Sequence, residues 1–163
     1  MSVLLSADQC ALQAKAREIA QGDGKARAAD VDRTEAYPWD NVELLKESGF
    51  LGMTLPEAYG GQGRSWLDAV VVIEEISKAC SVTGRIVVET NMGAVSAIMA
   101  YGSDEQKKFA ADMVLGGDKP AICITEPGTG PSAGGMTTWA AMNGTRESVK
   151  VTKPRTTAVG RPR

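Results

Sequence analysis

Residues 101–130 have the sequence YGSDEQKKFAADMVLGGDKPAICITEPGTG, in which a helical pattern gives way to a strand-like one. Ser103 and Gln106 have the spacing of a capping box, which begins a helix by satisfying its first free N–H groups. The two glycines and the proline of residues 116–120 predict where that helix ends. The short apolar run Ala121–Thr125 then favours a strand, and a glycine-rich turn follows it. This stretch therefore predicts a change from helices to strands near residue 118.

Four more helices are expected before this stretch, separated by glycine-rich connectors. They begin at the capping box Ser6–Gln9, at Trp39, at Ser65 and at Arg85, and the fourth runs to Tyr101. The helix from Ser65 to Cys80 has apolar residues on much of its circumference, which predicts packing on two sides. We therefore expect both Val70 and Ile73 to be fully buried.

After the turn, Thr137–Trp139 and Ser148–Thr152 are further candidate strands. The predicted fold class is mainly α, a bundle of about five helices followed by the first strands of a β-domain. We expect the helical domain to cover residues 1–117 and the β-domain to begin within 118–163. From about residue 142 the tail holds six basic residues and one acidic residue, whereas the chain as a whole carries a net charge of −2. The tail therefore reads as a divergent or truncated segment.

Composition excludes several classes of protein. A net charge of −2 gives no basis for nucleic-acid binding, and the longest apolar run, Ala69–Ile73, is too short to cross a bilayer. Residues 1–5 lack a basic segment, and the three cysteines are widely spaced, so a reducing cytoplasm is expected. The chain has no histidine, which removes Ser-His-Asp and Cys-His catalysis and most zinc sites, so we expect no metal.

The glycine-rich segment 128–135 has two readings from its residues alone. A dinucleotide fingerprint is disfavoured, because the glycine spacing is one residue too long and Pro131 interrupts it. A nest of free backbone amides that binds phosphate stays open, as does a plain turn. The neighbouring carboxylates Glu74 and Glu75 are interpreted as part of a solvated helix face, since adjacent helical residues point apart.

Three motifs in order resemble the acyl-CoA dehydrogenase family: residues 48–63, the helix start at 101–107, and residues 119–130 with Thr125-Glu-Pro127. The resemblance covers roughly residues 5–140. It implies a helical N-terminal domain, a β-barrel middle domain and a helical C-terminal domain, with FAD between them. Within the family, residues 37–41 and 117–124 resemble the branch that includes 3-sulfinopropionyl-CoA desulfinase.

The resemblance also implies site residues for cofactor and substrate. Thr125 would hydrogen-bond the edge of the isoalloxazine, where donors tune the flavin as a hydride acceptor. Pro131 stands where the family has a serine that contacts cofactor and acyl-CoA, and Ser132 supplies the nearest hydroxyl. Cofactor binding is carried over to Ile122, Ile124, Thr125, Gly130, Pro131, Ser132, Thr156 and Thr157, and substrate binding to Pro131 and Ser132. Arg155 stands where the family has a tryptophan that stacks on the flavin. The family's catalytic carboxylate lies in the C-terminal domain, so no catalytic residue is assigned in this chain.

The implied activity is that of an FAD-dependent acyl-CoA dehydrogenase-like oxidoreductase of fatty acid metabolism. Such an enzyme introduces an α,β double bond into an acyl-CoA thioester, and this chain would carry the front part of it. Two alternatives remain: an acyl-CoA desulfinase in the same fold, and a non-catalytic helical module that binds partners. The resemblance also implies a homo-oligomer and an electron-transfer partner in the cytoplasm.

Overall fold

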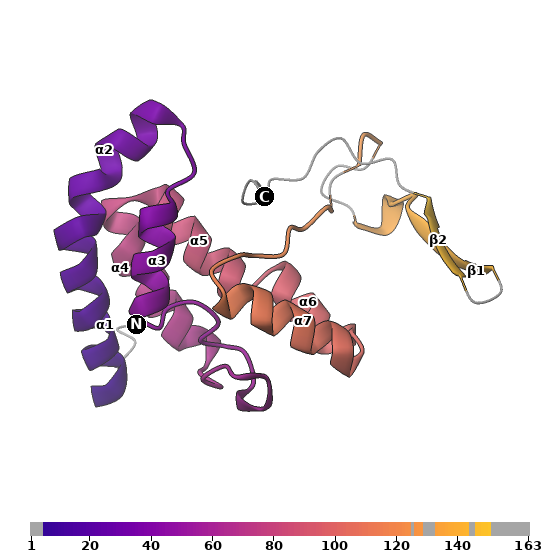
Figure 1. Ribbon diagram of the computed structural model, residues 1–163, viewed down its shortest axis with the longest axis horizontal. Helices are drawn as coiled ribbons and strands as arrows, with labels where there is room; N and C mark the ends of the chain where they lie inside the picture. Colours follow the sequence, from indigo (N-terminus) through magenta and orange to yellow (C-terminus); the bar gives the residue numbers. More distant parts are fainter. Residues whose placement is uncertain (1–4, 125, 129–132, 144–145, 151–163) are drawn as a thin grey trace. The chain divides into compact units, whose positions relative to one another are not determined.

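The computed structural model describes residues 5–124, 126–128, 133–143 and 146–150 (Figure 1). The described residues form two compact units, one ending at Pro120 and one beginning at Ala121. The first unit is helical and the second contains a β-hairpin. Each unit is described by itself.

The described residues of the helical unit form seven α-helices, with a long connector between the third and the fourth (Figure 1). They are α1 (Ala7–Ile19), α2 (Lys25–Thr34), α3 (Trp39–Glu47), α4 (Trp66–Ala79), α5 (Ser81–Asn91), α6 (Ala94–Tyr101) and α7 (Asp104–Leu115). The capping boxes at the starts of α1, α4 and α7 are present as two reciprocal hydrogen bonds each. The mainly helical fold class is thus confirmed.

Two of the expected helices are each split in the structure. The first continues past its glycines through a π-helical turn, η1 (Ala20–Gly24), into α2, with a kink at Gly22. The expected helix from Arg85 to Tyr101 is two helices, because Met92 is extended and Gly93 has a φ of 63°. That conformation is open to glycine and strained for other residues, so a glycine ends α5 here.

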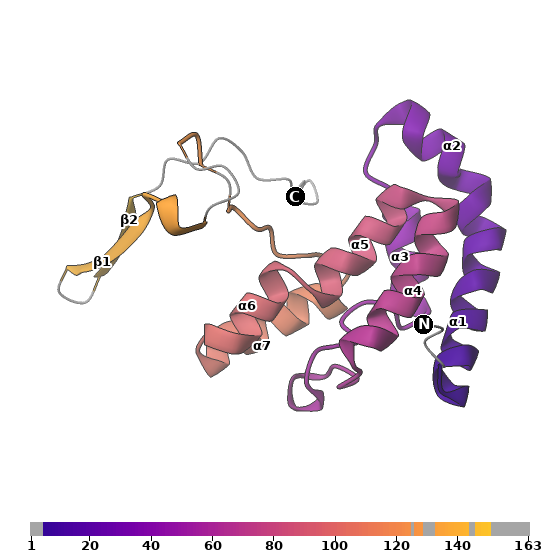
Figure 2. The same ribbon diagram turned by 180° about the vertical axis from the view of Figure 1, so that it is seen from behind.

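The core of this unit lies where α4 contacts both α1 and α5 (Figure 2). A side chain at Gly84 of α5 would place its Cβ 2.0 Å from the Oγ of Ser77, so glycine permits the close approach of α4 and α5. The connector between α3 and α4 also contributes to the core, which is unusual for a loop. Its fully buried side chains are Phe50, Leu51, Met53 and Leu55.

Helix α4 packs against both α1 and α5, as its apolar composition predicts, but the expectation that Val70 and Ile73 are both fully buried is wrong. Val72 is 0% exposed, but Val70 is 46% exposed and Ile73 is only partly buried. Trp66 and Leu67 are exposed as well. The buried residues of α4 are Ala69, Val71, Val72, Glu75 and Ile76, so the buried side of the helix is turned away from Val70.

The second unit contains a 3₁₀ turn, η3 (Ala133–Gly135), and the strands β1 (Trp139–Asn143) and β2 (Arg146–Lys150). The strands pair antiparallel, with Trp139 opposite Lys150 and Asn143 opposite Arg146. The strand expected at Thr137–Trp139 thus begins two residues later, and the one expected at Ser148 begins earlier. Ala121–Ile124 is not a strand, because apolar composition alone does not supply the ladder of backbone hydrogen bonds that a strand requires.

Candidate functional site

A buried amide ties the connector between α3 and α4 to the end of α5. Asn91 is 0% exposed, and its Nδ2 donates to the carbonyl oxygens of Phe50 and Val87, both at 2.9 Å. Its Oδ1 accepts a hydrogen bond from the backbone N–H of Thr54 at 3.2 Å. The connector, which carries the first of the three motifs, is therefore held by side-chain bonds as well as by its apolar residues.

An ionic cluster holds the chain just after α7. In sequence it precedes residues 122–132, which carry predicted cofactor contacts and are called the predicted flavin loop. The Lys119 side chain is 9% exposed and forms an ion pair with Glu89 of α5. The Nε of Arg85 donates to the same carboxylate at 2.8 Å, while the Arg85 side chain stays 61% exposed. Two cations thus share one carboxylate, so these three side chains together carry a net charge of +1, with the carboxylate of Asp118 beside Lys119.

The ring of Tyr37 packs against this cluster, with the Lys119 Nζ 5.4 Å from its centroid. Burial raises the pKa of Tyr37 to about 12, and the charge of Asp118 adds to the rise, so the phenol stays protonated at neutral pH. Burial lowers the pKa of Lys119, and the charge of Arg85 acts in the same direction. The ion pair with Glu89 therefore offsets the cost of burying the ammonium group.

In the second unit, Glu126 of the predicted flavin loop is hydrogen-bonded to Thr137 and Thr138, which follow that loop in sequence. It is 3% exposed, and its Oε2 accepts hydrogen bonds from the backbone N–H and the hydroxyl of Thr137 at 2.7 and 2.9 Å. Its Oε1 accepts a hydrogen bond from the N–H of Thr138 at 3.0 Å. Both carboxylate oxygens are thus engaged, and the ends of residues 127–136 are brought together.

The predicted cofactor residues fall partly within the described chain. Ile122 is 38% exposed and Ile124 is 56% exposed, so both offer apolar surface beside Glu126. Thr125, Gly130, Pro131, Ser132, Thr156 and Thr157 lie outside the described residues. Their assignment to cofactor and substrate stays a prediction.

Sequence reasoning did not assign roles to Asn91, Lys119 or Glu126. For Glu126 there was a signal, because a carboxylate beside a glycine-rich loop is followed by the donor pair Thr137-Thr138. The partners of Asn91 in the connector, Phe50 and Thr54, and the Glu89 partner of Lys119 are 30 or more residues away in sequence, and no local pattern indicates them.

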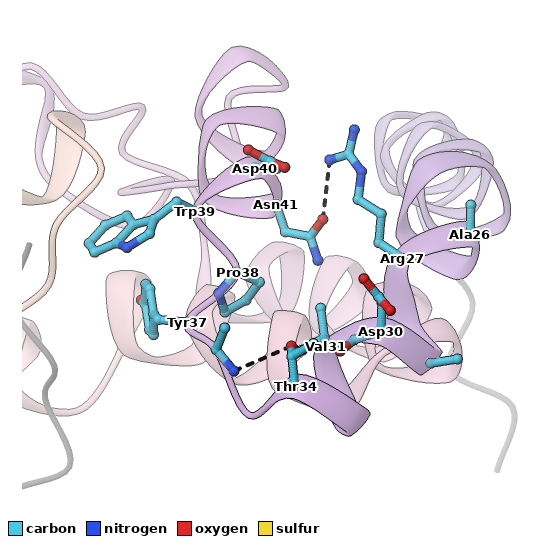
Figure 3. Close-up of a pocket in the computed structure, with 12 residues that line it drawn as sticks. Ala26, Arg27, Asp30, Val31, Thr34, Tyr37, Pro38, Trp39, Asp40 and Asn41 are labelled. Atoms are coloured by element: carbon cyan, nitrogen blue, oxygen red, sulfur yellow. Dashed lines mark hydrogen bonds between the residues drawn. The ribbon is translucent and has the colours of Figure 1, made fainter.

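A pocket of about 560 Å³ lies between α2 and the start of α3 (Figure 3). Arg27 reaches across it and donates to the Oδ1 of Asn41 at 3.3 Å, and the Nδ2 of Asn41 donates to Thr83 at 2.9 Å. Both ends of the Asn41 amide are thus engaged, and the pocket is lined by residues 26–41 of the helical unit.

The described residues contain no group of three or more Cys, Asp or Glu side chains arranged to hold a metal ion. None of the helices described is both long enough and apolar enough to span a membrane.

Comparison with known proteins gives matches over most of the chain. The acyl-CoA dehydrogenase N-terminal domain matches residues 6–117. A 3-sulfinopropanoyl-CoA desulfinase of Variovorax paradoxus is 59% identical over 140 residues, which is 86% of this chain and 35% of that protein. Three further desulfinases are 56–60% identical. A short-chain-specific acyl-CoA dehydrogenase of Clostridium acetobutylicum is 32% identical over 88% of this chain and 38% of its own length.

The solved structures agree with this assignment. The acyl-CoA dehydrogenase of Geobacillus kaustophilus superposes with a TM-score of 0.78 and 25% identity, over 91% of this chain and 39% of that one. The chain spans about a third of the length of the curated relatives that it matches. With the helical domain matched almost from end to end, the chain belongs to the acyl-CoA dehydrogenase family.

Proposed function

We propose that the protein containing this chain is an FAD-dependent enzyme that acts on an acyl-CoA thioester bearing a sulfinate on its β-carbon. The observation that carries this proposal is a difference in sequence identity between two groups of relatives. Four desulfinases are 56–60% identical to the chain, whereas dehydrogenases and reductases of other acyl substrates are 31–38% identical. The desulfinase reading is therefore preferred to simple α,β-dehydrogenation.

The charges of α5 support an acidic substrate. A β-sulfinyl acyl group carries a negative charge at the end remote from the thioester. Arg85 has its Nε bound to Glu89 while its side chain is 61% exposed, so the terminal edge formed by its two Nη groups stays available in a fixed orientation. Such a fork suits a sulfinate or carboxylate, and we propose Arg85 as its partner.

The described part of the loop fits a flavin. Ile122 and Ile124 expose apolar surface that suits a ring system, and Glu126 orders the segment that follows. Thr125, Gly130, Pro131, Ser132, Thr156 and Thr157 would complete the cofactor contacts. When bound, FAD supplies a hydride acceptor. We further propose that residues 1–117 form the N-terminal domain, that 118–163 begin the β-barrel domain, and that the protein is a cytoplasmic homo-oligomer with an electron-transfer partner.

The two chemistries differ in their redox balance, and this difference gives the test. Desulfination breaks the C–S bond and adds water across it, with a proton going to carbon and hydroxide to sulfur. It yields the saturated acyl-CoA and sulfite without an external oxidant. Dehydrogenation removes two hydrogens and needs an acceptor.

The experiment supplies the protein with 3-sulfinopropanoyl-CoA and, separately, with butanoyl-CoA, and follows sulfite release and the reduction of an acceptor dye. We expect sulfite without dye reduction. Dye reduction with butanoyl-CoA and no sulfite would assign a dehydrogenase instead. A purified protein that retains no flavin and turns over neither thioester would favour the non-catalytic module.

A further inference from the structure

We infer that Glu126 is a positioning residue, whose carboxylate holds together the two ends of residues 127–136 and so presets the flavin-binding loop. The inference rests on the proposed flavin role of residues 122–132. It assigns no contact between Glu126 and the flavin itself.

The first support is the completeness of the hydrogen bonding at this carboxylate. Three donors, two of them backbone N–H groups, converge on the two oxygens of Glu126 at 2.7–3.0 Å. Hydrogen bonds to an ionised acceptor are among the strongest in proteins. A carboxylate held in this way fixes the backbone of Thr137 and Thr138 relative to residue 126.

The second support is burial in exposed surroundings. Glu126 is 3% exposed, although Ile124, Pro127 and Gly128 beside it are all exposed. Burying a carboxylate is costly unless donors replace its water, and a plain turn does not require a buried carboxylate. The arrangement therefore indicates a side chain whose place in the loop is to order it.

The third support is what the contact encloses. Gly130, Pro131 and Ser132, which carry three of the proposed cofactor contacts, lie between Glu126 and Thr137 in sequence. Contacts that fix Glu126 against Thr137 and Thr138 lower the conformational entropy of these residues before a ligand arrives, so less ordering is needed on binding. Loss of these contacts should weaken flavin binding even though no direct contact is removed.

Thr137 offers a matched pair of variants. Its hydroxyl and its N–H both donate to the Oε2 of Glu126. Thr137→Val removes the hydroxyl while keeping shape, and Thr137→Ser keeps the hydroxyl. Glu126→Gln removes the charge and one acceptor, and Glu18→Gln, on the exposed face of α1, is the control for charge.

The experiment uses the protein that contains this chain and each variant of it. Amide exchange at Thr137 and Thr138 is measured without FAD. The affinity for FAD and the visible spectrum of the bound flavin are then measured. We expect faster exchange and roughly 10- to 100-fold weaker FAD binding in Glu126→Gln, and about tenfold weaker binding in Thr137→Val. Thr137→Ser and Glu18→Gln should stay within about twofold of the parent. The flavin band should shift in Glu126→Gln and Thr137→Val only, which a general loss of stability would not produce.

Unchanged exchange at both amides in Glu126→Gln would overturn the inference, and so would equal FAD affinity in all variants. If the protein that contains this chain retains no FAD, the proposed cofactor is overturned. Amides that are protected in that protein and exposed in Glu126→Gln would then place the failure with the cofactor, whereas amides unprotected in both would overturn the role of Glu126 as well.

Discussion

Glu75 is buried although its neighbour Glu74 is exposed. The pair Glu74-Glu75 was interpreted as a solvated helix face, but only Glu74 is exposed. The Glu75 side chain is 2% exposed, and Arg17 of α1 donates to both of its oxygens at 3.0 and 3.1 Å. Adjacent residues on a helix point apart, so one of the two can face the bundle. Which one does so depends on Arg17, 58 residues away, and no local pattern contains that information.

The buried Glu75 predicts a specific loss of stability in acid. The hydrogen bond from Arg17, with those of Lys78 after it, lowers the pKa of Glu75 below its ordinary 4.5 although burial opposes this. A carboxyl with a depressed pKa in the folded state stabilises the fold fully above the unfolded pKa, and this contribution is lost as pH falls through the folded pKa. In urea unfolding from about pH 6 to about pH 3, Glu75→Gln should therefore be less stable than the parent at pH 6 and flatter below about pH 4.5. Glu105→Gln, exposed at the start of α7, is the control, and parallel curves for Glu75→Gln and the parent would contradict the linkage.

Asn91 is the residue on which the buried connector depends most directly. Asn91→Ala would leave the carbonyl of Phe50 and the N–H of Thr54 without their side-chain partner. Unsatisfied buried groups cost about 1–3 kcal/mol each, so we expect a loss of roughly 2–4 kcal/mol in the free energy of unfolding. Chemical denaturation measures it, with exposed Gln21→Ala as the comparison. A loss equal to that of Gln21→Ala would show that water replaces the amide at no cost.

At the scale of elements, the starts of helices could be predicted from residues close in sequence, whereas the limits of strands depend on pairing and could not. The capping boxes at Ser6, Ser65 and Ser103 lie within four residues each, and all three begin helices as expected. The break at Gly93 was missed, because the apolar pattern of residues 85–101 continues through it and a glycine inside a helical pattern is tolerated. In the second unit, β-leaning composition placed strands near residues 139 and 148 but left their limits open, since pairing decides where a strand begins.

The phase of α4 provides a matched test on one helix. Val72 is 0% exposed and Val70 is 46% exposed, so the same substitution removes the same atoms from two environments. Val72→Ala should lower the free energy of unfolding by about 1.5–3 kcal/mol, through lost burial and the cavity left behind. Val70→Ala should change it by less than about 0.5 kcal/mol. Thermal or urea unfolding of the two variants decides this, and equal losses would show that Val70 is buried as fully as Val72.

At the scale of the whole molecule, the family and the helical fold could be predicted from three motifs. The contacts of Glu126 and Lys119 could not be predicted from them. The residues that hold the loop and its approach, Glu126 and Lys119, act through partners that folding brings to them. Motif matching marks where a loop is, but its geometry follows from hydrogen bonds and burial across the structure. The net positive charge at Arg85, Glu89 and Lys119 likewise emerges only once α5 and the segment after α7 meet.

The helical unit should fold without the segment that follows it. Every buried apolar residue of its core cluster lies between Ala16 and Val114, and about 120 residues suffice for an independent core. Residues 1–120 alone should therefore give a helix-dominated far-UV CD spectrum and a cooperative unfolding transition.

The position of the boundary can be tested with a chain three residues shorter. Residues 1–117 lack Lys119, so Glu89 of α5 would lose its buried partner and keep only the exposed Arg85. Removing one member of a buried, hydrogen-bonded pair leaves the other poorly solvated, and we expect a loss of about 1–3 kcal/mol relative to residues 1–120. Glu89→Gln in the shorter chain should recover part of that loss, since it discharges the carboxylate that has lost its partner. Equal free energies of unfolding for the two lengths would show that the helical domain is complete at residue 117. They would also show that the ion pair between Lys119 and Glu89 does not contribute to its stability.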